Sequence, residues 1–380
     1  MRFAWAVFGI LIVFAPAQAG IYNTTEIDEL RLSSDVSQFR ETLNKVRSIG
    51  FDKVDFDNLL RKRYFLNDAL GGAKPPVDLT LEQKLDYSAV LIRRKKYQQA
   101  IDFLTPLTRQ YPDMFLFESH LAMAYWGIGQ QTRAVEILSQ ALSKQGWPAT
   151  FGDMNDTQRT FISDAMGWNE GLFDFYRRSE MYLLKLMKQR LAEPSGAYET
   201  VDALFDDGKT PAKTIRFLND QGKFEPGRIA PAELKKLPPA ALEYVEQLCL
   251  WMPEDLRLYW LLGEMANAQW TPELLADSKK RDLAVGNLKA ANKIFDELVY
   301  DFKIRVNDLR ERRQVLHDFI QTVEAPRPTI DEFETELIKK ATPPEATMPT
   351  RTLLITFAAG LTVGIFAVWQ FQEIRRRRRG

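Results

Sequence analysis

Apolar residues return at intervals of three and four along most of the chain, which is the spacing of one face of an α-helix. The first stretch ends at Gly50 and predicts an amphipathic helix from Leu32, Val36, Phe39, Leu43 and Val46. A second helix is expected around residues 55–70. Helical spacing returns over residues 157–191 and again from about 240 to 323. The pattern predicts an all-α chain.

Proline and glycine divide these helical stretches. Residues 193–239 are rich in both, so we expect a loop-rich connector with short helical pieces. A Pro-rich spacer follows at 325–351. The predicted order within this part of the chain is an N-terminal helical region, helical repeats, the connector, a second helical region and the spacer, at residues 20–76, 77–192, 193–239, 240–324 and 325–351.

The N-terminal residues 1–19 have the pattern of a secretory signal peptide. Arg2 precedes an apolar stretch from Phe3 to Phe14, and Ala17-Gln18-Ala19 offers the small residues that signal peptidase accepts. We therefore expect the mature chain to begin at Gly20. The alternative is an uncleaved anchor, for which the apolar stretch is short.

Residues 352–371 predict a transmembrane helix, because twenty residues without a charge are enough to cross the hydrocarbon core. The basic tail, residues 372–380, should stay in the cytoplasm by the positive-inside rule, because it contains Arg375, Arg376, Arg377, Arg378 and Arg379. The prediction is a single-pass protein with an extracytoplasmic N-terminus, in the periplasm or at the cell surface. The alternative is a buried core helix with a basic tail.

Small residues recur along this predicted anchor. Thr356, Gly360 and Gly364 lie four apart on one helix face, which permits close helix–helix contact and hence a homodimer. An apolar helix followed by arginines also resembles bacterial C-terminal sorting signals. Such signals require a recognition motif before the helix, and the residues here match neither the Pro-Glu-Pro nor the Leu-Pro-x-Thr-Gly pattern. We therefore expect a permanent anchor, and a processed C-terminus is the alternative.

The composition limits the kinds of functional site that the chain could form. The 51 basic and 51 acidic side chains cancel, which argues against a generally basic nucleic-acid binder. A single cysteine, Cys249, excludes an intrachain disulfide framework, and the two histidines, His120 and His317, are interpreted as packing or surface residues. No phosphate-binding loop, zinc-protease motif or nucleophile elbow occurs. We expect neither an enzyme nor a bound metal or cofactor.

A repeat of 34 residues occupies residues 81–148. Small Ala100 returns as Ala134, and Leu104 returns as Leu138, as expected for helix hairpins whose two helices approach closely. The sequence resembles the tetratricopeptide-repeat (TPR) family in two units, 81–114 and 115–148. Departures from the family pattern are an absent aromatic in each first helix and a displaced proline in the second unit, at Lys84, Glu118, Gly146 and Pro148. Half-repeats also fit residues 240–291.

The resemblance implies a fold and a binding face. A TPR array is an antiparallel helix-hairpin solenoid that exposes a concave face formed by the first helix of each hairpin. The positions that would line this groove are Leu85, Ala89, Ile92, Arg93, Ser119, Met123 and Trp126. The lysine and asparagine of the family's carboxylate clamp are absent, so an apolar or aromatic peptide is the expected ligand. The alternative is that the apolar members pack against neighbouring helices.

Two functions remain after this reading. The first is an extracytoplasmic, membrane-tethered TPR scaffold that mediates protein–protein interactions with an envelope protein or peptide. The second is a transmembrane signal relay, in which binding outside changes the pairing of the anchor helix. The short tail disfavours the relay, because nine residues cannot form a cytoplasmic domain.

Overall fold

The computed structural model describes residues 35–48, 79–143, 147–193, 204–205, 215–268, 274, 277 and 280–324. The chain divides into two units, Met1–Val323 and Glu324–Gly380, and nearly all described residues belong to the first. The predicted signal peptide, second helix, spacer, anchor with Thr356, Gly360 and Gly364, and arginine tail lie outside the described residues. No helix within the described ranges is long and apolar enough to span a bilayer.

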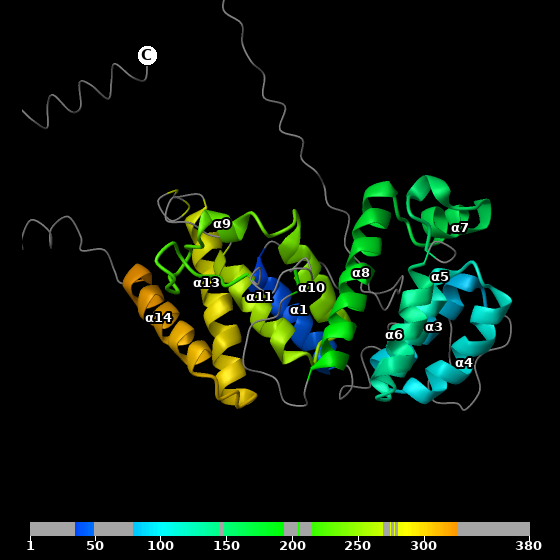
Figure 1. Ribbon diagram of the computed structural model, residues 1–380, viewed down its shortest axis with the longest axis horizontal. Coiled ribbons are helices and arrows are strands. Elements are labelled where there is room, and N and C mark those ends of the chain that lie inside the picture. Colours follow the sequence, from blue (N-terminus) through cyan, green and yellow to red (C-terminus); the bar gives the residue numbers. More distant parts are fainter. Residues whose placement is uncertain are drawn as a thin grey trace, which may run out of the picture. The chain divides into compact units, whose positions relative to one another are not determined.

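The described residues are helical, as the all-α prediction requires (Figure 1). They contain no strand and a single isolated bridge, between Glu225 and Arg228. The α-helices are α1 (Val36–Ser48), α3 (Leu81–Arg93), α4 (Tyr97–Gln110), α5 (Phe115–Gly127), α6 (Gln131–Ala141), α7 (Asp156–Thr160), α8 (Glu170–Ala192), α9 (Pro231–Leu234), α10 (Ala241–Trp251), α11 (Leu256–Ala268), α13 (Arg281–Asp296) and α14 (Asn307–Glu324). The irregular helical turns are η1 (Phe151–Asp153), η2 (Phe161–Ala165) and η4 (Glu297–Asp301), of which η2 and η4 are π-helical.

Helices α3 to α6 form two consecutive hairpins with the predicted period. Helix α3 begins at residue 81 and α5 at residue 115, 34 residues later, and α4 and α6 begin at residues 97 and 131, also 34 apart. Helix α5 contacts α3, α4 and α6, so the hairpins stack on one another. Ala100, Ala134, Leu104 and Leu138 are fully buried at the predicted contacts.

The turn inside each hairpin has the same backbone geometry. Lys95 in the first turn has φ +56°, and Gly129 in the second has φ +81°. The following amide closes each turn, since Lys96 N donates to Leu91 O at 2.8 Å and Gln130 N donates to Tyr125 O at 3.0 Å. Glycine takes this left-handed conformation without steric cost, whereas lysine does not.

The predicted helical pair over residues 157–191 is uneven. A five-residue α7 and the π-turn η2 end before Gly167, and the remainder is the single 23-residue helix α8. Asn169 caps α8, because its side chain accepts from Leu172 N at 2.9 Å. The segment before α8 is therefore a short helical piece of ten residues, 156–165, less than half the length of α8, a difference that the apolar spacing alone did not indicate.

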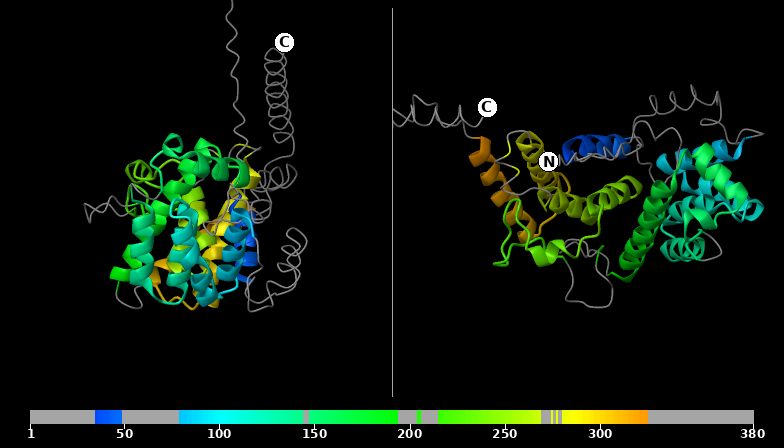
Figure 2. Two further views of the ribbon diagram at one scale, coloured as in Figure 1. Left: turned by 90° about the vertical axis from the view of Figure 1, so that its right-hand side faces the viewer. Right: turned by 90° about the horizontal axis from the view of Figure 1, so that it is seen from above.

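The second helical region consists of α10, α11 and α13 in sequential contact, with α1 packed against α10 and α13. Gly263 permits the close approach of α11 and α13, because a Cβ there would lie 2.5 Å from the ring of Phe295. Figure 2 shows that α1, which is close to the N-terminus, lies beside these helices from the later part of the sequence. Asn287 fastens it by accepting from Val36 N at 3.0 Å. The connector is loop-rich where described, with only α9 as a short helix.

Helix α8 joins the repeat hairpins to this second region. The ring of Phe175 on α8 stacks on Tyr244 of α10, with centroids 5.1 Å apart. At the other end of α8, Arg190 binds Asp255 through two hydrogen bonds, of 2.8 and 3.0 Å. Such bidentate arginine–carboxylate pairs fix direction as well as distance.

Candidate functional site

The residues predicted to line a peptide groove are brought together, but the chain itself covers them. Six of them are buried, and Trp126 alone is partly exposed; the buried six are Leu85, Ala89, Ile92, Arg93, Ser119 and Met123. Ser119 donates a hydrogen bond to Glu180 of α8, and Arg93 donates to Leu250 O of α10 at 2.6 Å. In this structure these six positions therefore pack against other parts of the chain, and two of them contact segments that follow the repeat.

His120 lies among these buried residues, beside Ser88. The Ser88 hydroxyl donates to Leu85 O at 2.7 Å and lies 2.7 Å from His120 Nδ1, an arrangement that places the imidazole proton on Nδ1. Burial, with a smaller contribution from the charge of Arg93, lowers the pKa of His120 to about 3. Since both side chains are fully buried, the pair cannot meet a substrate and serves as a neutral packing contact.

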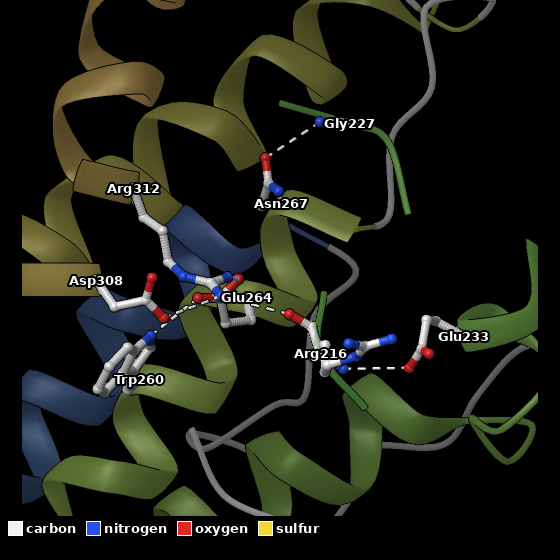
Figure 3. Close-up of polar contacts among 8 residues, drawn as sticks. All are labelled: Arg216, Gly227, Glu233, Trp260, Glu264, Asn267, Asp308 and Arg312. Atoms are coloured by element: carbon white, nitrogen blue, oxygen red, sulfur yellow. Dashed lines mark hydrogen bonds and ion pairs between the residues drawn. The ribbon is translucent and has the colours of Figure 1, made fainter. Parts of the chain in front are cut away.

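A second polar group, which we call the α11–α14 polar centre, consists of buried Trp260, Glu264 and Arg312 and of exposed Asp308 (Figure 3). Glu264 on α11 is completely buried, and Arg312 on α14 is 4% exposed. The Arg312 guanidinium donates to the Glu264 carboxylate at 2.8 Å, and the Trp260 indole donates to its other oxygen at 2.9 Å. Asp308 lies 3.3 Å from the same guanidinium.

The connector closes over this centre. Arg216 O accepts from Arg312 at 3.4 Å, and the ring of Phe224 lies 5.0 Å from the guanidinium carbon. Two further bonds hold the connector, from Arg216 N to Glu233 at 3.2 Å and from Gly227 N to Asn267 at 3.2 Å (Figure 3). The polar centre therefore joins α11, α14 and an irregular segment, whose Ile215, Phe217 and Ile229 are also buried in the core.

The electrostatics of the centre are dominated by desolvation. Burial raises the pKa of Glu264 to about 7, while the charge of Arg312 and the hydrogen bonds from Trp260 and Arg312 act to lower it. Glu264 can thus hold or release a proton near neutral pH. The Glu264 side chain has no exposed surface. It therefore acts as one partner of a structural ion pair and not as an accessible acid or base.

The sequence interpretation missed this centre. The arginines of residues 310–313 alternate with acidic residues, a pattern typical of a solvated face. The structure instead buries Arg312, and it pairs Arg313 with Asp296 at 2.5 Å. The available signal was the spacing, because Arg312 lies three residues after buried Leu309 and four before buried Leu316, on the apolar face of α14.

Within the described ranges, no group of three or more His, Cys, Asp or Glu side chains could hold a metal ion. Comparison with family models, with curated proteins and with solved structures finds no match for this chain. The likeness to TPR proteins accordingly remains a resemblance, and its support is the 34-residue period of α3 to α6.

Proposed function

We propose that this chain is a membrane-anchored extracytoplasmic scaffold of TPR-like hairpins that mediates protein–protein interactions in the cell envelope. The observation that carries the proposal is the repetition of both helices and of the turn between them after 34 residues. Stacked hairpins of this kind expose long surfaces to partners and commonly act as docking frames. The apolar residues 352–371 and the arginines after them support the anchored topology.

The partner surface of such a scaffold differs from the one expected from the family groove. The first-helix positions are buried, whereas apolar residues at the end of α5 are partly exposed. Tyr125, Trp126 and Ile128 are half-buried there, and Tyr97 of α4 lies against Gly127. An aromatic cluster with one exposed edge is the usual composition of a protein-binding hot spot. We therefore place the partner at the end of α5.

Photo-crosslinking in intact cells tests this surface. Replacing Trp126 by p-benzoylphenylalanine should yield specific adducts, because the reactive carbonyl would lie within the interface. The same replacement at Arg109, exposed on α4, is the control and should yield none. Identical adducts at both positions, or none at position 126, would remove the end of α5 as the docking surface.

The topology is tested independently of the partner. Full-length chain should resist alkaline extraction from membranes, and protease added outside spheroplasts should cleave between the helices described above. Complete extraction, or protection of the helices from external protease, would contradict the anchored extracytoplasmic arrangement.

A further inference from the structure

The turn between α13 and α14 displays large side chains that the core does not use. We call residues 297–306 the hairpin tip. Tyr300 and Phe302 in the tip are 60% and 41% exposed, and Tyr300 is the most exposed large hydrophobic residue of the described chain. Aromatic rings of this size normally contribute to the core, so their exposure at a turn suggests contact with something outside the chain.

The backbone of the hairpin tip is held in a specific shape. The π-turn η4 is closed by Phe302 N donating to Glu297 O at 2.9 Å, and Ile304 N donates to Leu298 O at 2.9 Å. Lys303 between these amides has φ +57°. π-turns and non-glycine residues in the left-handed conformation are both frequent at functional sites.

The same backbone motif occurs a second time in the chain. At η2, Met166 N donates to Phe161 O at 3.1 Å and Trp168 N donates to Ile162 O at 2.9 Å. The left-handed residue there is Gly167, with φ +67°. Glycine removes the steric cost of this conformation, so the lysine at position 303 is retained against local stability.

The repeat hairpins contain a lysine in this conformation whose ammonium group forms an ion pair. Lys95 occupies the position of Gly129, and its ammonium group pairs with Glu254 of the second helical region. Lys303 is exposed and has no hydrogen-bond or ion-pair partner among the described residues. No described residue therefore engages the ammonium of Lys303, whereas that of Lys95 is engaged by Glu254.

Charge favours an anionic partner for the tip. Lys303 and Arg305 are exposed there, against the single exposed acid Asp301. Two further guanidiniums lie against the rings but already have partners within the chain: that of Arg313, paired with Asp296, is 4.8 Å from the Tyr300 ring centre, and that of Arg47, which donates to Pro253 O, is 5.6 Å from the Phe302 ring centre. Aromatic rings combined with lysine and arginine are the composition that settles at the headgroup level of a bilayer.

We propose that the hairpin tip binds the anionic headgroups of the membrane to which the chain is tethered, so that the scaffold lies on the bilayer surface. This inference rests on the anchored topology proposed above. The chain length permits it, because residues 325–351 can extend to about 90 Å at 3.3 Å per residue. Helix α14, with 18 residues, separates the tip from the start of this segment by only about 27 Å.

A polarity-sensitive fluorophore on the tip tests the proposal in the full chain. Asp301→Cys places the label between Tyr300 and Phe302, and the unsubstituted chain is the blank because Cys249 is buried. Chain reconstituted in nanodiscs of phosphatidylcholine is compared with chain in an equimolar mixture of phosphatidylcholine and phosphatidylglycerol. The label should report an apolar environment in the mixed lipid alone, and a label at Gln99 of α4 should report water in both.

Variants that remove a basic side chain from the hairpin tip test whether its charge contributes to the lipid contact. Lys303→Gly and Arg305→Ser should each lower the ratio of membrane-bound to free tip about fivefold, as expected for one basic residue at an anionic surface. The matched pair Lys235→Ser and Arg109→Ser removes exposed charge elsewhere and should change nothing. Lys303→Gly also relieves the left-handed strain, so its weaker lipid contact should accompany a more stable fold, which separates recognition from misfolding.

The outcomes distinguish the two proposals. Chain that fails to enter nanodiscs of either composition contradicts the anchor. Chain that enters them while the tip label stays in water overturns the lipid contact alone and leaves an acidic protein surface as the tip's partner. Equal burial of the label in both lipids would also overturn the proposal, because the contact would not depend on anionic headgroups.

Discussion

His120 in the repeat hairpins and Glu264 in the second helical region are both fully buried ionisable side chains, but their surroundings differ. His120 contacts the hydroxyl of Ser88, a neutral partner on the neighbouring hairpin. Glu264 contacts the guanidinium of Arg312, a charged partner on α14. The first contact joins two copies of one repeat, and the second joins helices that share no repeat.

The difference follows from the ordinary pKa of each group. A histidine sheds its charge near neutral pH, so burying it requires only a hydrogen bond. A carboxylate is ionised at the same pH, and burying it requires a cation or a proton. The repeat can therefore bury His120 with a local partner, whereas α11 needs a side chain from a separate helix. This requirement makes the polar centre a determinant of where α14 lies.

The largest expected effect is on the centre itself. Arg312→Met keeps the length of the side chain but leaves Glu264 buried without its cation, which should cost about 3–5 kcal/mol. Hydrogen exchange in α14 at neutral pH should accelerate strongly. The control Arg310→Met, on the same helix but exposed, should have little effect, and equal acceleration in both variants would contradict the role of the buried pair.

The second prediction concerns acid and the repeat hairpins. The folded chain keeps His120 neutral down to a pKa of about 3, below the ordinary 6.5, so the unfolded chain binds more protons between these values. Stability from this group is complete above pH 6.5 and is lost as the pH falls, by about 2 kcal/mol at pH 5. Thermal unfolding of solubilised full chain should show this loss.

Histidine variants assign the acid effect. His120→Gln keeps a hydrogen-bonding amide near Ser88 but does not titrate, so it should flatten the pH dependence below 6.5. His317→Gln, which changes the partly exposed histidine of α14, is the matched control and should leave the dependence unchanged. An unaltered slope in His120→Gln would show that another group causes the acid sensitivity.

Sequence reasoning predicted the repeat hairpins well because their determinants are local. The spacing of Ala100 and Leu104, repeated at Ala134 and Leu138, carries the information for both helices and for their contact. The burial of the predicted groove positions has a non-local cause. Whether Met123 or Ser119 faces solvent depends on where α8 and α10 lie, and their distance along the chain leaves no periodic signal.

The α11–α14 polar centre, in the second helical region, also depends on a contact that the sequence pattern does not reveal. The pairing of Glu264 with Arg312 joins residues 48 apart that belong to different helices. Alternating charge around Arg312 indicates a solvated surface, and only the buried neighbours Leu309 and Leu316 argue otherwise. A single sequence is enough to predict the apolar face of α14. It does not show which carboxylate will lie against Arg312 on that face.

The third prediction tests the opposite sign of the two buried groups. The pKa of Glu264 is raised to about 7 in the fold, so the folded chain binds more protons than the unfolded chain between 4.5 and 7. This group therefore adds stability as the pH falls through that window, by about 1.4 kcal/mol per pH unit, and offsets His120. Glu264→Gln should steepen the loss of stability in acid, whereas His120→Gln should reduce it. Slopes that change in the same direction in both variants would contradict this assignment.

The smallest effect compares the two lysines in left-handed conformation. Lys303→Gly should stabilise the fold by about 1 kcal/mol, because glycine removes the strain and the lysine has no partner in the described chain to lose. Lys95→Gly removes the same strain but also the pair with Glu254, which is exposed and contributes between about 0 and 1 kcal/mol, so its net gain should be smaller. Thermal unfolding of the two variants side by side gives the difference. A Lys303→Gly chain no more stable than the natural one would mean that Lys303 already has a stabilising contact, and the free cation assigned to the hairpin tip would then be lost.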